Sequence, residues 1–150
     1  MNRCLIWLFI SATTFSFSQE FNFDVNGLSP KYLVQEVDSL NQLKLFEKTI
    51  NWIKENYVNP DEVIKTSIAN EKIRFSGSKE NVLCWKRLGV TNCSDVRYTI
   101  EISFKNGKYK VEPISLEYFD PGGDYSRVGW YKISLINGSD YYKKGKIRKI

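Results

Sequence analysis

The sequence predicts an α+β fold, in which an antiparallel sheet of four or five strands carries one helix packed on a face. Apolar residues recur at helical spacing over residues 42–57, and apolar and polar residues alternate strictly over residues 96–104. Aromatic residues make up 15% of the chain, and this abundance favours strands. We therefore expect one mixed domain rather than a helical bundle.

The helix is predicted over Gln42–Tyr57. Ser39 and Gln42 have the spacing of a capping box, with Ser39 as the N-cap. Asn59-Pro60 ends the helix, because the residue before a proline avoids helical backbone. We interpret the apolar face as core packing rather than as a cofactor or partner groove. That face consists of Leu43, Phe46, Ile50, Ile53 and Tyr57.

A hairpin is predicted directly after the helix, over residues 63–76. With Asn70-Glu71 as a two-residue turn, Ile68 would face Ile73 across the two strands. This register places apolar residues together on one face, as a buried sheet requires.

The second hairpin has the clearest strand pattern. Asn106-Gly107 is a favoured two-residue turn, since both of its positions need positive φ. Around this turn Phe104 faces Tyr109, and one face of the hairpin is apolar. Pro113 removes a hydrogen-bond donor from the sheet, so we expect a bulge or an edge after it. A last short strand or turn is expected near residues 129–135.

Residues 77–94 read as an irregular excursion that contains Cys84 and Cys93. In an exported protein these two cysteines are predicted to form a disulfide. A metal site is not predicted, because the chain has no histidine and two isolated thiols do not complete a tetrahedral site.

Residues 1–18 are typical of a cleavable signal peptide. Arg3 precedes an unbroken apolar run, and Ser16-Phe17-Ser18 is a small-residue cleavage site. The apolar run is too short for a transmembrane span, which needs about 20 residues. The sequence therefore predicts export to the periplasm or the extracellular space. The remaining residues, 19–150, are expected to form a single domain.

The net charge of +5 is concentrated at the C-terminus. Residues 19–140 contain 16 Lys and Arg against 17 Asp and Glu, so the body of the protein is nearly neutral. A body-wide nucleic-acid surface is not supported. The basic tail is interpreted as a solvated end, with weak attraction to an acidic envelope partner as the alternative. Its charges are Lys143, Lys144, Lys146, Arg148 and Lys149.

Neither a catalytic group nor a cofactor site is evident in the sequence. Without histidine, a serine or cysteine nucleophile lacks its usual base. Ser76 and Lys79 have the Ser-x-x-Lys spacing of penicillin-recognising enzymes, but the accompanying motifs are missing. Asp120 with Asp124, or Asp61 with Glu62, are candidates for paired-carboxylate hydrolysis by residue type alone. We predict a protein that is not an enzyme.

Aromatic residues gather in the C-terminal third of the chain, next to the basic tail. They read either as core and sheet-edge packing or as a stacking surface for a glycan or peptide. The candidate binding surface comprises Trp130, Tyr131, Tyr141, Tyr142, Lys143 and Lys144.

With its elements in this order, the chain resembles a family of exported Bacteroidota proteins that carry a domain of unknown function with a TBP-like fold (DUF4468). The resemblance rests on the helix containing Trp52, the hairpin over residues 64–75 and the run over residues 98–109. It covers about residues 30–118. It implies a fold and an export address, and it brings no catalytic residues.

Two departures from that family pattern stand out. The segment with Cys84 and Cys93 looks like a variable insertion, and the C-terminal helix of family members is not found in this sequence. We expect a non-catalytic binding or interaction module of the envelope, with an envelope protein or a glycan as its partner. The alternatives are a hydrolase acting on an envelope polymer through paired carboxylates, and a structural part of a larger envelope protein.

Overall fold

The computed structural model describes residues 20–87, 89–123, 126–143 and 146–147. The predicted signal peptide and its cleavage site before Gln19 lie outside these residues. In chain order the elements are β1 (Asn22–Asp24), β2 (Gly27–Ser29), β3 (Leu33–Glu36), α1 (Gln42–Asn56), α2 (Pro60–Val63), β4 (Ile64–Ile68), β5 (Lys72–Arg87), β6 (Val90–Lys105), β7 (Lys108–Asp120), β8 (Gly129–Ile133), a 3-10 turn η1 (Ser139–Tyr141), β9 (Tyr142–Lys143) and β10 (Lys146–Ile147).

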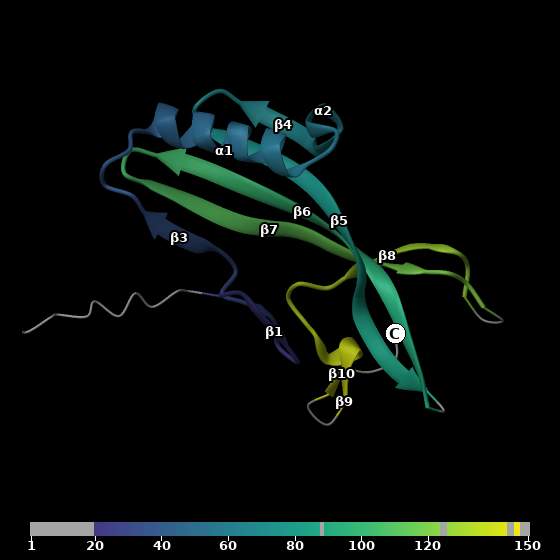
Figure 1. Ribbon diagram of the computed structural model, residues 1–150. Helices are drawn as coiled ribbons and strands as arrows, with labels where there is room; N and C mark the ends of the chain where they lie inside the picture. The colour runs from purple at the N-terminus through teal and green to yellow at the C-terminus, as the bar shows by residue number, and fades with distance from the viewer. Residues whose placement is uncertain (1–19, 88, 124–125, 144–145, 148–150) are drawn as a thin grey trace, which may run out of the picture.

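The main sheet is antiparallel and has six strands in the order β3-β7-β6-β5-β4, with β8 also paired to β7 (Figure 1). This is more than the four or five strands predicted. The difference arises because β7 is long enough to share one edge between two partners. β3 pairs with Lys108–Val111, and β8 pairs with Leu116–Asp120.

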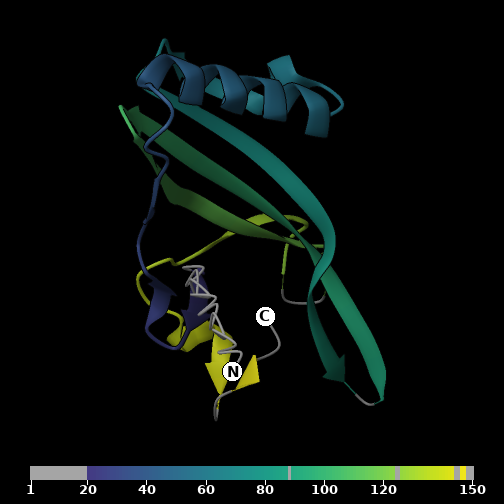
Figure 2. The same ribbon diagram turned by 60° about the vertical axis from the view of Figure 1, so that its left-hand side comes forward.

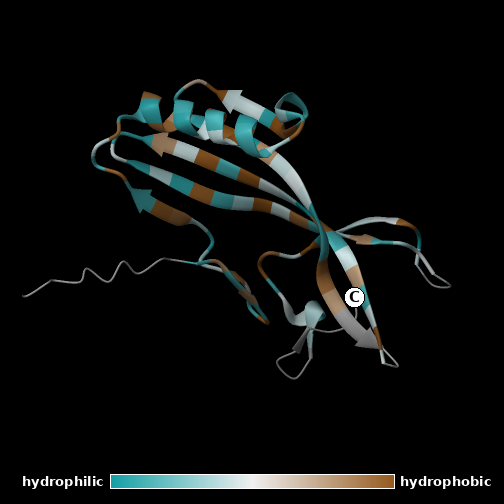
Figure 3. Cartoon of the chain, in the orientation of Figure 1, coloured by the Kyte–Doolittle hydropathy of each residue, from teal (hydrophilic) through white to brown (hydrophobic). Residues whose placement is uncertain are grey.

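Both α-helices lie on one side of this sheet (Figures 1 and 2). Side chains alternate between the two faces of each strand, and Figure 3 shows the alternation of apolar and polar residues along the strands of the sheet. The apolar set of β5 and β6 packs with residues of α1. Burying this set removes apolar surface from water, which is the main driving force for the fold. The buried core consists of Leu45, Ile53, Ile73, Phe75, Ile102 and Phe104.

The structure corrects the predicted helix at two points. The N-cap is Asn41 rather than Ser39, because the Lys44 N–H donates to the Asn41 side chain at 2.9 Å. Leu45 is buried whereas Leu43 is exposed, so Leu45 takes the place predicted for Leu43 on the inward face. The rest of the predicted apolar face does pack in or against the core. The Asn106 side chain of the β6–β7 turn accepts a bond from the Gln42 N–H at 3.0 Å. This turn therefore helps to fix the direction in which α1 begins.

The register of the first hairpin differs from the prediction. Ile68 pairs with Lys72 rather than with Ile73, so the loop contains three residues instead of two. Asn70 has φ 61°, a left-handed conformation that suits a three-residue hairpin loop. The extra loop residue moves Ile68 to the polar face of the sheet, where it is exposed.

The second hairpin is confirmed. Phe104 pairs with Tyr109 around the Asn106-Gly107 turn. The register then shifts between Thr99 and Ile100, opposite Pro113, which is the predicted bulge.

Residues 77–94 are not irregular, as predicted from sequence, but belong to the two longest strands. β5 and β6 remain paired up to Arg87 and Val90, beyond the ends of their outer neighbours. We call residues 79–95 the hairpin arm (Figure 1). A bulge at its base carries Asn81 at φ 55°, and the Asn81 N–H donates to the Asp95 carboxylate at 2.9 Å.

Within the part of the chain that the structure describes, no helix is both long and apolar enough to cross a membrane. That part also contains no C-terminal helix, because the chain after β8 forms only η1 and two short strands.

Candidate functional site

The face of the main sheet that points away from α1 forms a continuous polar surface, which we call the open face. Its members follow from the strand pairings, because directly paired residues point to the same side. Its charged members are Glu36, Lys72, Arg74, Arg97, Glu101, Lys105, Lys108, Lys110, Glu112, Glu117 and Lys132, and its uncharged polar and aromatic members include Ser76, Thr99, Ser103, Ser115, Phe119 and Trp130.

An ion-pair network lies at the centre of the open face. The Arg74 guanidinium donates to the Glu101 carboxylate at 2.7 and 3.1 Å, and the Lys72 ammonium lies 3.7 Å away. The hydrogen bonds from Arg74, together with the charges of Lys72 and Lys110, hold the pKa of Glu101 below its usual 4.5. Glu101 is therefore a fixed anion that orients the cations around it.

A second cluster lies where β8 joins the sheet. Arg97 donates through two nitrogens to Glu117, and its guanidinium carbon lies 4.6 Å from the centre of the Trp130 ring. The Trp130 ring also packs against Phe119, with ring centres 5.4 Å apart. This arrangement combines a cation–π contact with a charge-assisted pair.

The same edge of the open face carries a second aromatic residue, beside β3. Tyr32 directly precedes β3 and is half exposed. The Lys110 ammonium lies 5.4 Å from its ring centre and also bonds to Glu112. Two points along this edge of the open face, one beside β3 and one on β8, thus combine an aromatic ring with a cation.

The structure does not bring the predicted aromatic and basic residues together on one surface. Trp130 lies on the open face, whereas its neighbour Tyr131 lies on the other face and stacks on Tyr118. Successive residues of a strand point to opposite faces, which explains this separation. Tyr141 and Tyr142 instead pack on Phe23 near the N-terminus. The Lys143 side chain and Lys144 lie outside the described residues.

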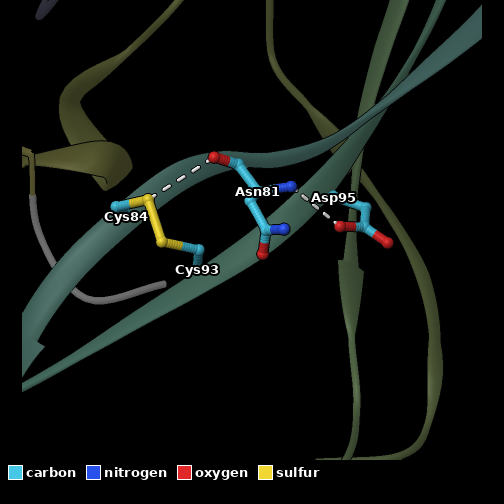
Figure 4. Close-up of a disulfide and its surroundings, with 4 residues drawn as sticks. All are labelled: Asn81, Cys84, Cys93 and Asp95. Atoms are coloured by element: carbon cyan, nitrogen blue, oxygen red, sulfur yellow. Dashed lines mark hydrogen bonds between the residues drawn. A yellow bond between two sulfur atoms is a disulfide. The ribbon is translucent and has the colours of Figure 1, made fainter.

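The predicted disulfide is present, and it joins directly paired residues of the hairpin arm (Figure 4). The Cα atoms of Cys84 and Cys93 lie 4.1 Å apart, and both residues are exposed. An isolated two-stranded hairpin is marginally stable in water. The disulfide therefore acts as a staple for an arm that lacks neighbouring strands.

Replacing both cysteines, as in Cys84→Ser/Cys93→Ser, should destabilise the arm by about 2–3 kcal/mol, through the freedom that the unfolded loop regains. Amide hydrogen exchange should speed up within residues 79–95 and stay unchanged in α1. Uniformly faster exchange over the whole sheet would contradict this local role. Mass analysis without reductant should show no alkylatable thiol among these two cysteines.

A groove of about 720 Å³ lies beside α1 on the covered face of the sheet. Its floor is apolar, and α1 contributes a polar rim with Lys48, Asn51 and Glu55. Trp52 forms part of its wall and is 47% exposed. The apolar floor consists of Val37, Leu40, Leu45, Ile102, Tyr109 and Val111.

The geometry offers little support for paired-carboxylate hydrolysis. Glu101 and Glu112 are directly opposed on β6 and β7, but such chemistry needs one acid with a raised pKa, and that of Glu101 is lowered. Asp120 accepts a bond from the Gly122 N–H in a tight turn, and Asp124 lies outside the described residues. No group of three potential metal ligands occurs among the residues described.

The Ser-x-x-Lys motif lies within β5 rather than at the start of a helix. The Ser76 hydroxyl lies 2.9 Å from that of Thr99 across the sheet. Gly77 is required for packing, because a Cβ there would lie 2.5 Å from the Tyr98 hydroxyl oxygen. The motif is thus explained by local strand packing.

Glu101 should make stability depend on pH in the acid range. Because its pKa is lowered in the folded state, its pairing stabilises the fold fully above pH 4.5 and is lost as the pH falls through the lowered value. Urea unfolding of the Glu101→Gln variant should therefore show a shallower loss of stability below pH 4.5 than the wild type. Glu55→Gln, on α1, is the control, and it should follow the wild-type curve. Parallel curves for wild type and Glu101→Gln would refute the assignment.

A family model, described as a domain of unknown function (DUF4468) with TBP-like fold, matches residues 32–119. The chain belongs to the DUF4468 family. The match spans 88 of the 150 residues and runs from β3 almost to the end of β7. It confirms the resemblance seen in the sequence, and the TBP-like fold with it.

Two solved structures are similar to this DUF4468 protein. A DUF4468 family protein from Bacteroides ovatus is 15% identical, with a TM-score of 0.52 over 73% of this chain and 60% of that chain. A TBP-like protein from Parabacteroides distasonis is 19% identical, with a TM-score of 0.50 over 67% of this chain and 63% of that one. The chain thus spans less than two thirds of the length of either. No curated protein matches the sequence.

The segments on either side of the DUF4468 match pack together. We call β1, β2 and residues 133–142 the terminal unit, which lies at the end of the molecule away from α1 (Figure 2). The Leu28 N–H donates to the Leu135 carbonyl at 2.8 Å, and the Gly138 N–H donates to the Val25 carbonyl at 3.1 Å. The Tyr142 hydroxyl donates to the Phe23 carbonyl. Residues more than 100 positions apart in sequence therefore form one substructure.

Proposed function

We propose that this DUF4468 protein is an exported, non-catalytic binding module of the bacterial envelope, and that the open face is its binding surface. One observation carries the proposal: the face opposite α1 presents two exposed aromatic rings, Tyr32 and Trp130, each against a cation, along the edge where β3 and β8 pair with β7. Exposed aromatic side chains next to charges are typical of recognition surfaces rather than of passive surfaces.

The export part of the proposal rests on the signal pattern of residues 1–18. Expression of the full chain in a bacterial host, followed by fractionation, should place the protein outside the cytoplasm. N-terminal sequencing of that fraction should begin at Gln19. A chain that stays in the cytoplasm with Met1 intact contradicts this part.

The binding part is tested by applying residues 19–150 to glycan and peptide arrays. The matched variants are Trp130→Ala and Tyr131→Ala, adjacent residues of nearly equal exposure, 36% and 37%, on opposite faces of β8. Trp130→Ala should weaken binding to any ligand found, and Tyr131→Ala should leave it unchanged. Empty arrays, or a larger loss from Tyr131→Ala, would contradict the proposal.

A further inference from the structure

The open face carries a surplus of positive charge that the protein as a whole does not have. It holds seven cations, Lys72, Arg74, Arg97, Lys105, Lys108, Lys110 and Lys132, against the four carboxylates of Glu36, Glu101, Glu112 and Glu117. The rest of residues 19–140 holds nine cations against thirteen carboxylates. The molecule is therefore polarised across the sheet, with the positive side opposite α1.

Two of the four acids of the open face, Glu101 and Glu117, are recessed beneath their basic partners. The Glu101 side chain is 12% exposed and that of its partner Arg74 is 40% exposed. The Glu117 side chain is 16% exposed, against 46% for Arg97. An approaching ligand thus meets the cations first, while these carboxylates are already occupied by hydrogen bonds. Such a surface attracts anions, and its guanidinium groups suit carboxylates.

The positive charge is spread thinly along the sheet. Lys108 and Glu117 mark the ends of the charged part of β7, a span of about 30 Å at the usual rise per residue. Double-stranded DNA carries one negative charge about every 1.7 Å of its axis, far denser than the surplus on this face. A polymer with widely spaced charges matches the open face better.

The uncharged groups between the cations favour sugars. Ser76, Thr99, Ser103 and Ser115 place hydroxyls among the charged residues, and these can bond to the hydroxyls of a sugar. Tyr32 and Trp130 offer aromatic rings at two points along the β7 edge of the face, against which apolar faces of sugar rings can pack. A membrane surface would instead favour protruding apolar residues at the centre of the face.

We infer that the open face binds an acidic polysaccharide, a chain of sugars that carries carboxylate groups. This inference rests on the proposed binding function and specifies its ligand class. The cations neutralise the sparse carboxylates of the polymer, the hydroxyl residues bond to the sugar hydroxyls, and the rings of Tyr32 and Trp130 pack against the sugar rings.

The test compares two polymers with the same backbone. Residues 19–150 are titrated with polygalacturonate and with fully methyl-esterified polygalacturonate, which lacks the charge, by isothermal calorimetry at low and physiological salt. Binding to the acid form should be at least tenfold tighter and should weaken with salt. Single-stranded DNA and phosphatidylglycerol vesicles are titrated in parallel and should bind more weakly than polygalacturonate.

Two matched variants locate the site. Lys108→Gln/Lys132→Gln removes two cations from the open face that form no ion pair among the described residues. Lys48→Gln/Lys54→Gln makes the same charge change on α1. The first pair should weaken binding to polygalacturonate by about tenfold, and the second should change it little. Circular dichroism of each variant verifies that it is folded.

The outcomes separate this inference from the proposed function. Equal affinity for the acid and the ester overturns the inference and leaves a binding module for neutral sugars. Binding to DNA or vesicles as tight as to polygalacturonate also overturns it, as does an equal loss from the α1 variant. Binding to none of these ligands, together with empty arrays, overturns both.

Discussion

Replacing Ile73 by alanine is expected to lower the free energy of unfolding by about 2–5 kcal/mol. Ile73 is completely buried, and it lies in β5 directly opposite Ile102 of β6, within the cluster covered by α1. Removing its side chain takes apolar contacts from both the sheet and the helix, and it leaves a cavity that a rigid sheet fills poorly. The change is measured by urea denaturation of residues 19–150, with the midpoint and slope fitted separately.

Ile136→Ala is the matched control, because Ile136 is 80% exposed and lies outside the sheet. Its free energy of unfolding should stay within about 0.5 kcal/mol of the wild type. If the free energy of unfolding of Ile73→Ala also stayed within that range, it would contradict the burial of Ile73 between α1 and the sheet. A large effect of Ile136→Ala would mean that this side chain is covered in solution.

Replacing Gly138 by alanine should detach the terminal unit. A Cβ at this position would lie 1.8 Å from the carbonyl oxygen of Asp24, which is backbone and cannot rotate away. The two segments must then move apart, and the bonds that Leu28 and Gly138 make across the unit are lost. Overpacking of this kind costs about 1–3 kcal/mol and more where the neighbours are rigid.

Amide hydrogen exchange is the suitable measurement, because the loss should be local. In the wild type the amides at positions 28 and 138 should be protected from exchange. In Gly138→Ala their protection factors should fall at least tenfold, while those of the α1 amides should stay unchanged. Gly129→Ala is the control, since nothing lies within 4 Å of the added Cβ. Unchanged protection in Gly138→Ala would show that β1 and β2 do not dock on residues 133–142.

Within the residues of the DUF4468 match, the structure was predicted well where the sequence signals are local. The β6–β7 hairpin follows from strict alternation and from an Asn-Gly turn whose backbone preference is independent of the rest of the chain. The disulfide follows from the number of cysteines that remain after the predicted cleavage. α1 and most of its inward face were also predicted, but Leu43 was chosen in place of Leu45, because the two are equally apolar and only the position of the sheet distinguishes them.

The hairpin arm shows where a local pattern fails. Most of residues 79–84 and 89–95 are exposed, so no core demands that their polar and apolar residues alternate. The predicted register of the first hairpin was wrong by one residue for a related reason. Asn70 tolerates the left-handed conformation that a three-residue loop needs, and a single sequence contains no sign of which loop length is used.

The open face could not be assembled from the sequence at all. Arg74 and Glu101 are 27 residues apart, and they meet because β5 and β6 pair in a register that the sequence analysis did not predict. Conversely, Trp130 and Tyr131 are adjacent in sequence but lie on opposite faces of β8. Proximity along the chain was therefore a poor guide to which residues share a surface.

The sequence by itself determined the fold class, the turn of the second hairpin and the cysteine pair, since each depends on local backbone preference, periodicity or composition. The tertiary structure decided the strand count, the register of the first hairpin, the joining of both ends into the terminal unit and the charge of the open face. These features depend on which distant strands pair and in which register. A shift of one residue moves every side chain of a strand to the other face, so only the assembled sheet determines which residues meet.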